Sequence, residues 1–228
     1  MKTIGIIGGL GWPSTAIYYQ EINKRIGAHL GGNHCAKLIV IQADLEEILE
    51  LEGANEWSRI GQLMVDMAER LKAAGADFFL LACNTMHKSL VPFKHTLPLP
   101  FLDIVDTAAK KAIAYQKVAL IGSKPTMTDN YFLGPLITEY GLKVLVPPVA
   151  QQDAIQTALH GELVKGLVLE STKMMFAKVV ADLIDRGAEL IILGCTEFGM
   201  LLQQTDISVP VLETLAAHVE AAVDFAVN

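Results

Sequence analysis

Short apolar runs rich in β-branched residues alternate along the chain with longer segments whose apolar residues recur at helical spacing. The short runs predict buried strands at 3–8, 37–42, 78–83, 118–122, 143–147, 190–194 and 209–212. The longer segments predict helices, the clearest at 14–30, 57–74, 104–115 and 169–186. Strands that alternate with helices form βαβ units, in which a parallel sheet is covered on both faces. The predicted fold class is therefore α/β.

This pattern occurs twice at a nearly constant offset. The matching segments are Ile4 to Gly8 with Val118 to Gly122, Gly75 to Cys83 with Gly187 to Cys195, and Pro100 to Asp103 with Pro210 to Glu213. The repeat predicts two pseudosymmetric lobes, each a three-layer α/β/α sandwich, with an active site in the cleft between them. We place the first lobe at 1–105 and the second at 106–208. The tail, 209–228, could return to the first lobe.

Composition narrows the class of protein. The 228 residues are 52% hydrophobic and 19% charged, which suits a soluble globular protein. A net charge of −7 without a basic run argues against nucleic-acid binding. No apolar run approaches the roughly 20 residues that span a bilayer, so we expect no membrane segment. Residues 3–7 fit a first strand better than a signal peptide, which predicts a cytoplasmic protein.

The candidate chemistry lies in two of the three cysteines. Cys83 and Cys195 each follow an apolar strand at equivalent positions of the repeat, whereas Cys35 has no counterpart and is expected to be structural or incidental. Ligands of open parallel sheets bind beyond the carboxyl ends of the strands. The residues after each cysteine are small and polar and are expected to open a helix, whose N-terminus attracts carboxylates and can lower a cysteine pKa from about 8.5.

Two such thiols suit proton exchange at a stereocentre. Inversion without a cofactor needs one group to remove the α-proton and another to return a proton on the opposite face. Asn84, Thr85 and Thr196, with nearby backbone N–H groups, are candidates to stabilise the enolate-like carboxylate that develops. A cysteine at a strand end often only packs in the core, but the repeated placement favours chemistry.

Other polar residues near these motifs have two interpretations each. His87 and Glu197 could tune the neighbouring thiols, or pack and cap their turns. Lys165 could reach a substrate side-chain carboxylate, or be an exposed lysine near a helix end. The glycine-rich loop at 8–15 lacks the G-x-G-x-x-G spacing of a dinucleotide site. It, and the loop at 122–126, fit a strand-to-helix turn that lines a small-molecule cleft.

Taken together, the motifs resemble the aspartate/glutamate racemase family, closest to its aspartate racemase and broad-specificity amino-acid racemase branch. The resemblance covers essentially the whole chain. It is carried by the loop ending in Ser14-Thr15, by Cys83-Asn84-Thr85-Met86-His87, by the loop Gly122 to Thr126, and by Gly194-Cys195-Thr196-Glu197. It implies catalysis by both cysteines, no pyridoxal phosphate, no metal, an amino-acid substrate and a homodimer.

The resemblance also implies roles for single residues. Asn84, Thr85 and Thr196 correspond to ligands of the substrate α-carboxylate, and Leu10 and Gly11 to residues that line the site. Thr126 and Lys165 are the remaining substrate-binding candidates, with His87 and Glu197 in support.

Departures from the family pattern bear on the substrate. Glutamate racemases typically carry Asp-Ser in the first loop and Thr-His after the second cysteine, where this chain has Gly9-Leu10 and Thr196-Glu197. A cell-wall glutamate racemase is therefore disfavoured. The segment 42–52 lacks the arginine typical of strict aspartate racemases. We expect aspartate, glutamate or a broader set of polar amino acids.

Two alternatives stay open at this point. Relatives in the same superfamily isomerise or decarboxylate dicarboxylic acids at similar cysteine sites. A non-catalytic amino-acid-binding protein would retain the cleft without needing mirrored thiols. Exchange of the substrate α-proton separates these alternatives from a racemase.

Overall fold

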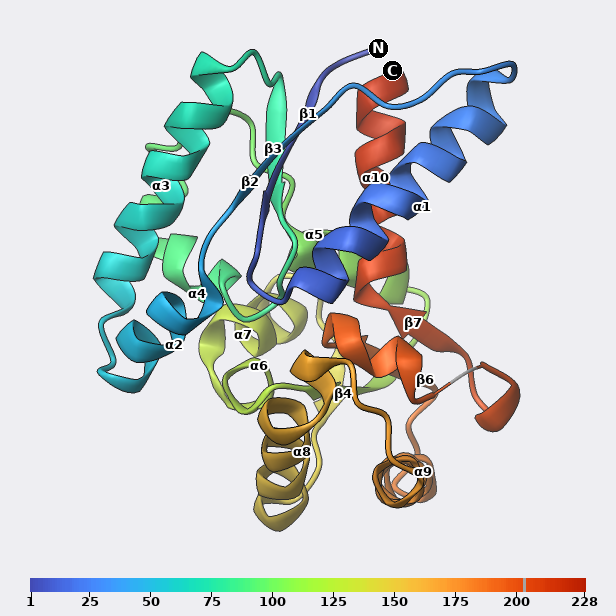
Figure 1. Ribbon diagram of the computed structural model, residues 1–228. Helices are drawn as coiled ribbons and strands as arrows, with labels where there is room; N and C mark the ends of the chain where they lie inside the picture. The colour runs from blue at the N-terminus through green and yellow to red at the C-terminus, as the bar shows by residue number, and fades with distance from the viewer. Residues whose placement is uncertain (203) are drawn as a thin grey trace. The chain divides into compact units, whose positions relative to one another are not determined.

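The computed structural model describes residues 1–202 and 204–228, and divides the chain into two compact units (Figure 1). Unit 1 comprises Met1–Ile104 and His218–Asn228, and unit 2 comprises Val105–Ala217. The tail beyond residue 208 is thus shared, because its strand pairs in unit 2 and most of its helix belongs to unit 1. No helix of the described residues is both long and apolar enough to cross a membrane.

Unit 1 is built on a parallel sheet with the strand order β2-β1-β3. Its strands are β1 (Ile4–Gly8), β2 (Leu38–Gln42) and β3 (Phe78–Leu81). Its helical elements are α1 (Trp12–Leu30), α2 (Leu45–Gly53), α3 (Trp57–Ala73), α4 (His87–Leu90), η1 (Val91–Phe93) and most of α10 (Thr214–Val227). The outer edge of β3 is covered by a bridge between Phe79 and Phe101.

Helices cover both faces of this sheet because its strands are apolar on both sides. On one face, Ile7, Phe79 and Leu81 pack in a core that also includes side chains of α2 and α3. On the other face lie α1 and α10, as Figure 1 shows. The rings of Phe78 and Phe225 stand 4.6 Å apart there and join β3 to α10.

Unit 2 repeats the plan with a parallel sheet in the order β5-β4-β6-β7. Its strands are β4 (Lys117–Gly122), β5 (Lys143–Leu145), β6 (Leu190–Gly194) and β7 (Val211–Glu213). Its helical elements include α5 (Ile104–Ala112), α6 (Lys124–Thr128), α7 (Asn130–Thr138), α8 (Val149–Gly161), η2 (Leu163–Lys165), α9 (Glu170–Asp185), η3 (Thr196–Met200) and η4 (Gln204–Asp206).

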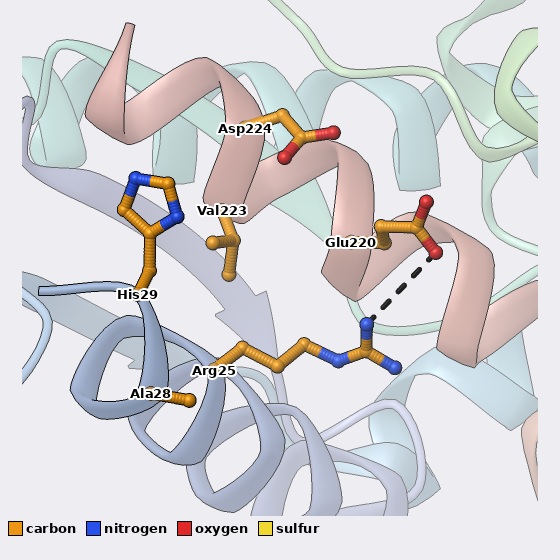
Figure 2. Close-up of a pocket in the computed structure, with 6 residues that line it drawn as sticks. All are labelled: Arg25, Ala28, His29, Glu220, Val223 and Asp224. Carbon is orange, nitrogen blue, oxygen red and sulfur yellow. Dashed lines mark ion pairs between the residues drawn. The ribbon is translucent and has the colours of Figure 1, made fainter.

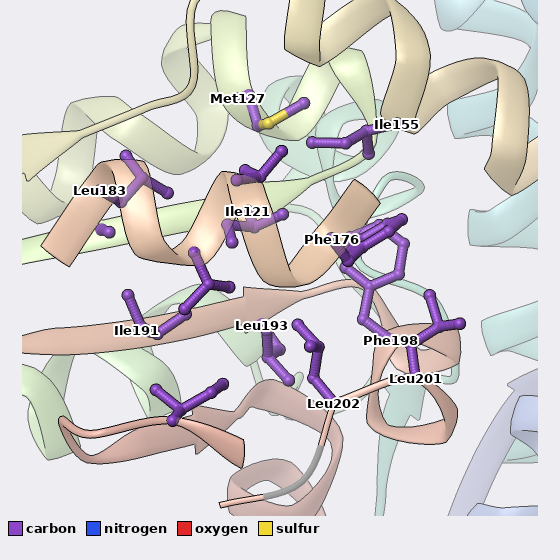
Figure 3. Close-up of a cluster of buried hydrophobic side chains, with 14 of the residues drawn as sticks. Ile121, Met127, Ile155, Phe176, Leu183, Ile191, Leu193, Phe198, Leu201 and Leu202 are labelled. Atoms are coloured by element: carbon purple, nitrogen blue, oxygen red, sulfur yellow. The ribbon is translucent and has the colours of Figure 1, made fainter. Parts of the chain in front are cut away.

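The core of unit 2 joins its sheet to α8, α9 and the turn after β6 (Figure 3). Phe176 of α9 and Phe198 of η3 meet edge to face, with ring centroids 4.7 Å apart, beside Leu193 of β6. Aromatic pairs in this geometry add about 0.5–1.5 kcal/mol beyond the area they bury. The buried ring of Phe198 therefore anchors the turn after β6 in the core of unit 2.

The predicted fold class is confirmed. Each predicted apolar run holds a strand, and the four predicted helices are present with ends shifted by a few residues. The repeat is structural as well, because β1 and β4 occupy matching central positions in their sheets. The pairing of Ile7 with Leu81 in unit 1 corresponds to that of Ile121 with Leu193 in unit 2.

Gly9 offers a test of the first strand-to-helix turn. Its φ of 77° lies in the left-handed region, and a Cβ there would stand 2.8 Å from the amide nitrogen of Ala43 and closer still to its carbonyl oxygen. Backbone strain at a positive φ costs about 1–3 kcal/mol, and the clash with Ala43 adds to it. We therefore expect Gly9→Ala to lower the free energy of unfolding by more than the strain alone would. Urea unfolding measures this.

Gly32→Ala is the matched control, because Gly32 also has a positive φ, of 56°, and nothing lies within 4 Å of the point where its Cβ would stand. The difference between the two variants isolates the clash with Ala43. Equal losses would contradict a close approach of the two segments.

Candidate active site

Cys83 stands immediately beyond the buried end of β3. The N–H of Ala82 donates to the carbonyl oxygen of Ile7 at 2.9 Å, which extends the ladder one residue past the strand. Cys83 then leaves the sheet and is half-buried, while the strand behind it is fully buried. The thiol therefore lies at the carboxyl edge of the sheet, where ligands of such sheets bind.

The segment after Cys83 is a series of tight turns. Asn84 is buried and Thr85 half-buried, and their carbonyl oxygens accept the N–H groups of His87 and Lys88 at 3.1 Å each. These bonds hold the two polar residues directly beside the thiol. Asn84 and Thr85 are thus brought together with Cys83, as the sequence predicts.

The expectation that each cysteine opens a regular helix is wrong. After Cys83, α4 spans only four residues and begins at His87, and after Cys195 the chain forms the 3₁₀ turn η3. A single turn aligns too few peptide dipoles for a strong field at its N-terminus. Local polar groups, rather than a helix dipole, must set the environment of each thiol.

His87 fixes the turn by its ring rather than by contact with sulfur. Its Nδ1 lies 2.8 Å from the carbonyl oxygen of Cys83, and its Nε2 lies 3.2 Å from the backbone nitrogen of Ile104. Since that N–H must donate to Nε2, the hydrogen of the neutral ring is on Nδ1 and donates to Cys83. Burial lowers the pKa of His87, which agrees with the neutral ring that these hydrogen bonds require.

A second histidine stands behind the first. The rings of His87 and His218 are 5.9 Å apart, and His218 Nε2 lies 3.0 Å from the carbonyl oxygen of Leu102. The hydroxyl of Tyr18 lies 2.8 Å from Nδ1, so it donates there while Nε2–H donates to Leu102. Burial, with a smaller contribution from His87, lowers the pKa of His218 to about 3.

Sequence reasoning missed His218. It lies in α10, among apolar residues such as Leu215, Val219 and Ala222 at helical spacing. A lone histidine within such a stripe is the signal that could have pointed to it, because a buried imidazole needs hydrogen-bond partners.

The first glycine loop is held by Thr15. Its hydroxyl oxygen accepts the N–H of Gly9 at 3.0 Å and donates to the carbonyl oxygen of Gly11 at 3.5 Å. Leu10 and Gly11, the predicted lining residues, are both buried. The backbone of this loop is therefore hydrogen-bonded to a side chain of α1 at two points.

Cys195 occupies the matching position in unit 2. It follows the buried end of β6, is half-buried, and its Sγ donates to Oε2 of Glu197 at 3.0 Å. The hydroxyl of Thr196 donates to the same oxygen at 2.8 Å. Thr196 and Glu197 are both buried. One carboxylate oxygen thus receives both the thiol and the neighbouring hydroxyl.

Thr126 lies at the adjacent strand end of unit 2 and is fully buried. Its hydroxyl is 3.0 Å from that of Ser123 and 2.7 Å from that of Tyr131. Its methyl group packs where a side chain at Gly122 or Gly194 would have to stand. These contacts make it a structural neighbour of the strand end that precedes Cys195.

Lys165 is exposed at the end of η2. That turn packs against η3, the segment that follows Cys195. Gly166, in the left-handed region with a φ of 75°, closes η2 by donating its N–H to the carbonyl oxygen of Leu163 at 2.9 Å. The lysine therefore stands on a defined turn next to the Cys195 segment.

A carboxylate absent from the predicted set also lies at this edge. Glu213 ends β7, is paired in register with Leu193, and its Oε2 would stand 2.7 Å from a Cβ placed at Gly199 in η3. Burial raises the pKa of Glu213. The repeat that matches 210–213 with 100–103 was the signal for it, since Asp103 is the corresponding buried carboxylate.

A pocket of about 320 Å³ in unit 1 lies between α1 and α10 (Figure 2). Its lining is Arg25, Ala28, His29, Glu220, Val223 and Asp224. The Arg25–Glu220 ion pair, 3.9 Å long and exposed at both ends, spans it. Its residues come from the second half of α1 and the second half of α10, and none of them is a candidate site residue. The pocket therefore does not belong to the candidate active site.

Comparison with known proteins gives one consistent family. A family model described as Asp/Glu/hydantoin racemase matches residues 7–222. Among curated proteins, the chain is 23% identical to the broad specificity amino-acid racemase RacX of Bacillus subtilis, over 96% of each chain. It is 30% identical to a glutamate racemase of Herpetosiphon aurantiacus over 60% of this chain and 55% of that protein.

Two solved structures resemble this protein over its full length. A putative Asp/Glu racemase from Yersinia pestis is 36% identical, with a TM-score of 0.92 and complete coverage of both chains. An aspartate racemase homologue from Pyrococcus horikoshii is 28% identical, with a TM-score of 0.83 and complete coverage of both chains.

The buried histidine pair generates a prediction about acid stability. The folded ring of His218 resists protonation down to about pH 3, whereas an unfolded histidine takes up a proton near pH 6.5. Between these values the unfolded chain binds more protons, so stability that is complete above pH 6.5 is lost as the pH falls.

We expect His218→Phe to reduce the slope of the free energy of unfolding against pH by up to about 1.4 kcal/mol per pH unit, which is the contribution of one proton. The variant is expected to be less stable than the wild type at neutral pH. Urea unfolding at a series of pH values between 7 and 4 measures the slope. His95→Gln, at an exposed histidine, is the control and should leave the slope unchanged. An unchanged slope in His218→Phe would contradict the buried neutral ring.

Proposed function

Because the chain belongs to the Asp/Glu/hydantoin racemase family, we propose that it racemises a polar amino acid without a cofactor, with Cys83 and Cys195 as the acid/base pair. One observation carries the proposal. Leu81 pairs with Ile7 and Leu193 with Ile121, and each cysteine lies two residues beyond the strand partner. Proton transfer on the two faces of one carbon needs two acid/base groups, and the repeat supplies one thiol at the same strand end of each unit.

The proposed reaction moves one proton off the α-carbon and another onto it. A thiolate takes the α-proton of one enantiomer and becomes a thiol, while the electron pair of the broken C–H bond delocalises into the α-carboxylate. The thiol on the other side then gives its proton to the opposite face of the α-carbon and becomes a thiolate. The reverse reaction exchanges the two roles, so no net charge or oxidant is consumed.

The carboxylate must be stabilised while it carries this extra charge. Asn84 and Thr85 beside Cys83, and Thr196 beside Cys195, are polar groups held at the strand ends by the turns described above. We propose them as the ligands of the substrate α-carboxylate. Leu10 and Gly11 are proposed to line the same site. Preorganised donors of this kind commonly supply the largest share of such stabilisation.

The residues that follow the two cysteines make different contacts with them. Cys195 donates its S–H to Glu197, so this carboxylate is placed to receive the thiol's proton when Cys195 acts as the base. His87, by contrast, bonds the backbone of Cys83, and its other ring nitrogen is engaged by Ile104. We propose Glu197 as a proton partner of Cys195 and His87 as a positioning residue for Cys83.

The substrate class rests on the relatives and on Lys165. RacX is described as a broad specificity amino-acid racemase, and other relatives as aspartate or glutamate racemases. Lys165 stands on the turn that packs against η3, where a cation suits a distal carboxylate. We therefore propose aspartate, glutamate and similar polar amino acids as substrates.

The decisive experiment is proton NMR of D- and L-amino acids incubated with the reduced protein in D₂O without added cofactor. We expect loss of the α-proton signal together with appearance of the opposite enantiomer, strongest for acidic or polar side chains. The absence of exchange over the whole panel, with protein shown to be folded, would refute the proposal. Conversion of a dicarboxylic acid that has no amino group, without exchange of any amino acid, would favour an isomerase.

Single cysteine variants test the division of labour. Cys83→Ala and Cys195→Ala should each abolish net racemisation, because one face of the α-carbon then lacks its acid or base. The remaining thiol can still remove and return the α-proton of one enantiomer, so exchange in D₂O persists for that enantiomer alone. Cys35→Ala is the control and should remain fully active, since Cys35 is exposed in a loop. Full racemisation by either of the first two variants would rule out the two-thiol mechanism.

Glu197→Gln tests the partner of Cys195. Glutamine keeps a hydrogen-bond acceptor of the same shape but does not take up the thiol's proton. We expect α-proton exchange to fall by roughly 10²-fold for the enantiomer whose proton Cys195 removes, and much less for the other. The readout is the ratio of the two exchange rates. Glu170→Gln, at an exposed carboxylate of α9, should leave that ratio unchanged. An equal fall for both enantiomers would indicate a structural role only.

A further inference from the structure

The strand β2 has an open edge that is not protected in the usual ways. It pairs with β1 on one side, and no strand of the described residues pairs with it on the other. Natural edges are commonly blunted by charged residues, proline, bulges or shortness. The sequence of β2, Leu-Ile-Val-Ile-Gln, has none of these features. By comparison, the edge strand β5 is three residues long and begins with a lysine.

The backbone groups that face outward can be assigned from the register. The N–H of Ile4 donates to the carbonyl oxygen of Lys37 at 2.9 Å, and the N–H of Ala43 donates to that of Gly8 at 3.0 Å. Successive residues of a strand turn their backbone groups to opposite sides. The N–H and C=O groups at positions 38, 40 and 42 therefore point away from β1.

The side chains of these outward-facing positions border an apolar hollow. A pocket of about 380 Å³ is lined by Trp12, Thr15, Ala16, Tyr19, Val40 and Gln42. Trp12 is 67% exposed, Tyr19 58% and Val40 39%. Ile39 and Ile41 point to the opposite face and pack against the core beside α2 and α3. Large aromatic rings beside an open strand are a composition typical of protein interfaces.

The occupant that these features fit is a second copy of the same strand, antiparallel to the first. Exposed Lys37 stands where β2 begins, and the exposed carboxylates Asp44, Glu46 and Glu47 follow where it ends. Antiparallel pairing brings the basic end of each copy to the acidic end of the other, twice over. Parallel pairing would bring like charges together, which is unfavourable.

We infer that β2 pairs with β2 of a second copy across a two-fold axis at Val40, which joins the sheets of two unit 1 domains into one. In this register Val40 faces Val40 of the other copy, and Leu38 faces Gln42. Every outward-pointing N–H and C=O of positions 38, 40 and 42 is then hydrogen-bonded. The Trp12 and Tyr19 rings flank the strand pair.

Light scattering coupled to size exclusion, with the full chain, provides the first test. We expect a mass twice the chain mass of 24.7 kDa for the wild type. Val40→Lys places two like charges at the axis and should raise the dimer dissociation constant by roughly 100-fold or more. Val149→Lys is the matched control, because Val149 is 65% exposed on α8, and it should remain dimeric. A monomeric wild type, or a dimer that Val40→Lys leaves intact, would overturn the inference.

Disulfide trapping tests the register without relying on a destabilised variant. In a Cys35→Ser background, Val40→Cys should form a disulfide-linked dimer on mild oxidation, because hydrogen-bonded antiparallel partners have Cα atoms about 5.5 Å apart. Leu38→Cys alone should not, whereas a mixture of Leu38→Cys and Gln42→Cys should. Non-reducing electrophoresis gives the answer. Failure of Val40→Cys to cross-link, with the protein dimeric, would place the interface elsewhere.

Discussion

The position of Cys83 depends on the two hydrogen bonds of the His87 ring. The ring joins the backbone of Cys83 to that of Ile104, the last residue of the first segment of unit 1. His218 then bonds Leu102, two residues earlier, from the returning helix α10. The place where the chain leaves unit 1 and the place where it comes back are thus tied to the thiol turn through two neutral, buried rings. Protonation of either ring's acceptor nitrogen would place a charge in a buried site and break the hydrogen bond that this nitrogen accepts.

The duplicated frame has been given different chemistry in its two halves. In each, a threonine packs its methyl group against the glycine that ends the central strand, Thr15 against Gly8 and Thr126 against Gly122. That close approach is permitted only because glycine has no Cβ. The two cysteines differ in their neighbours. The thiol of Cys195 in unit 2 donates a hydrogen bond to the carboxylate of Glu197, while the carbonyl oxygen of Cys83 in unit 1 accepts one from the imidazole of His87. Two similar units therefore carry cysteines at equivalent strand ends, with different residues in contact with each.

Sequence patterns predicted the parts of this arrangement that depend on local order. Strands 78–81 and 190–194 are continuous apolar runs, and a cysteine just after such a run is expected at the carboxyl edge of a parallel sheet. The length of the elements after the cysteines was not predictable in the same way. Four to five residues carry too little periodicity to separate a helix from a 3₁₀ turn, and burial of Phe198 against Phe176 fixes the latter by tertiary contact.

Contacts between residues distant in the sequence could not be predicted either. Tyr18 and His218 meet only because α1 and α10 cover the same face of the unit 1 sheet. Nothing local to either residue specifies the other. Glu197 is a different case. The sequence places it next to Cys195, but only its side-chain rotamer determines that one of its oxygens accepts hydrogen bonds from both the thiol and Thr196.

Fold stability and thiol chemistry place the same demand on pH. The histidine pair contributes fully to stability only where an unfolded histidine would also be neutral, above about pH 6.5. A cysteine base acts as its thiolate, whose population grows as the pH rises. Acid would therefore lower the stability of the fold around Cys83 and, in the proposed mechanism, also deplete the thiolate. Both effects have the same sign, because the contribution of the histidines to stability and the thiolate population both rise with pH.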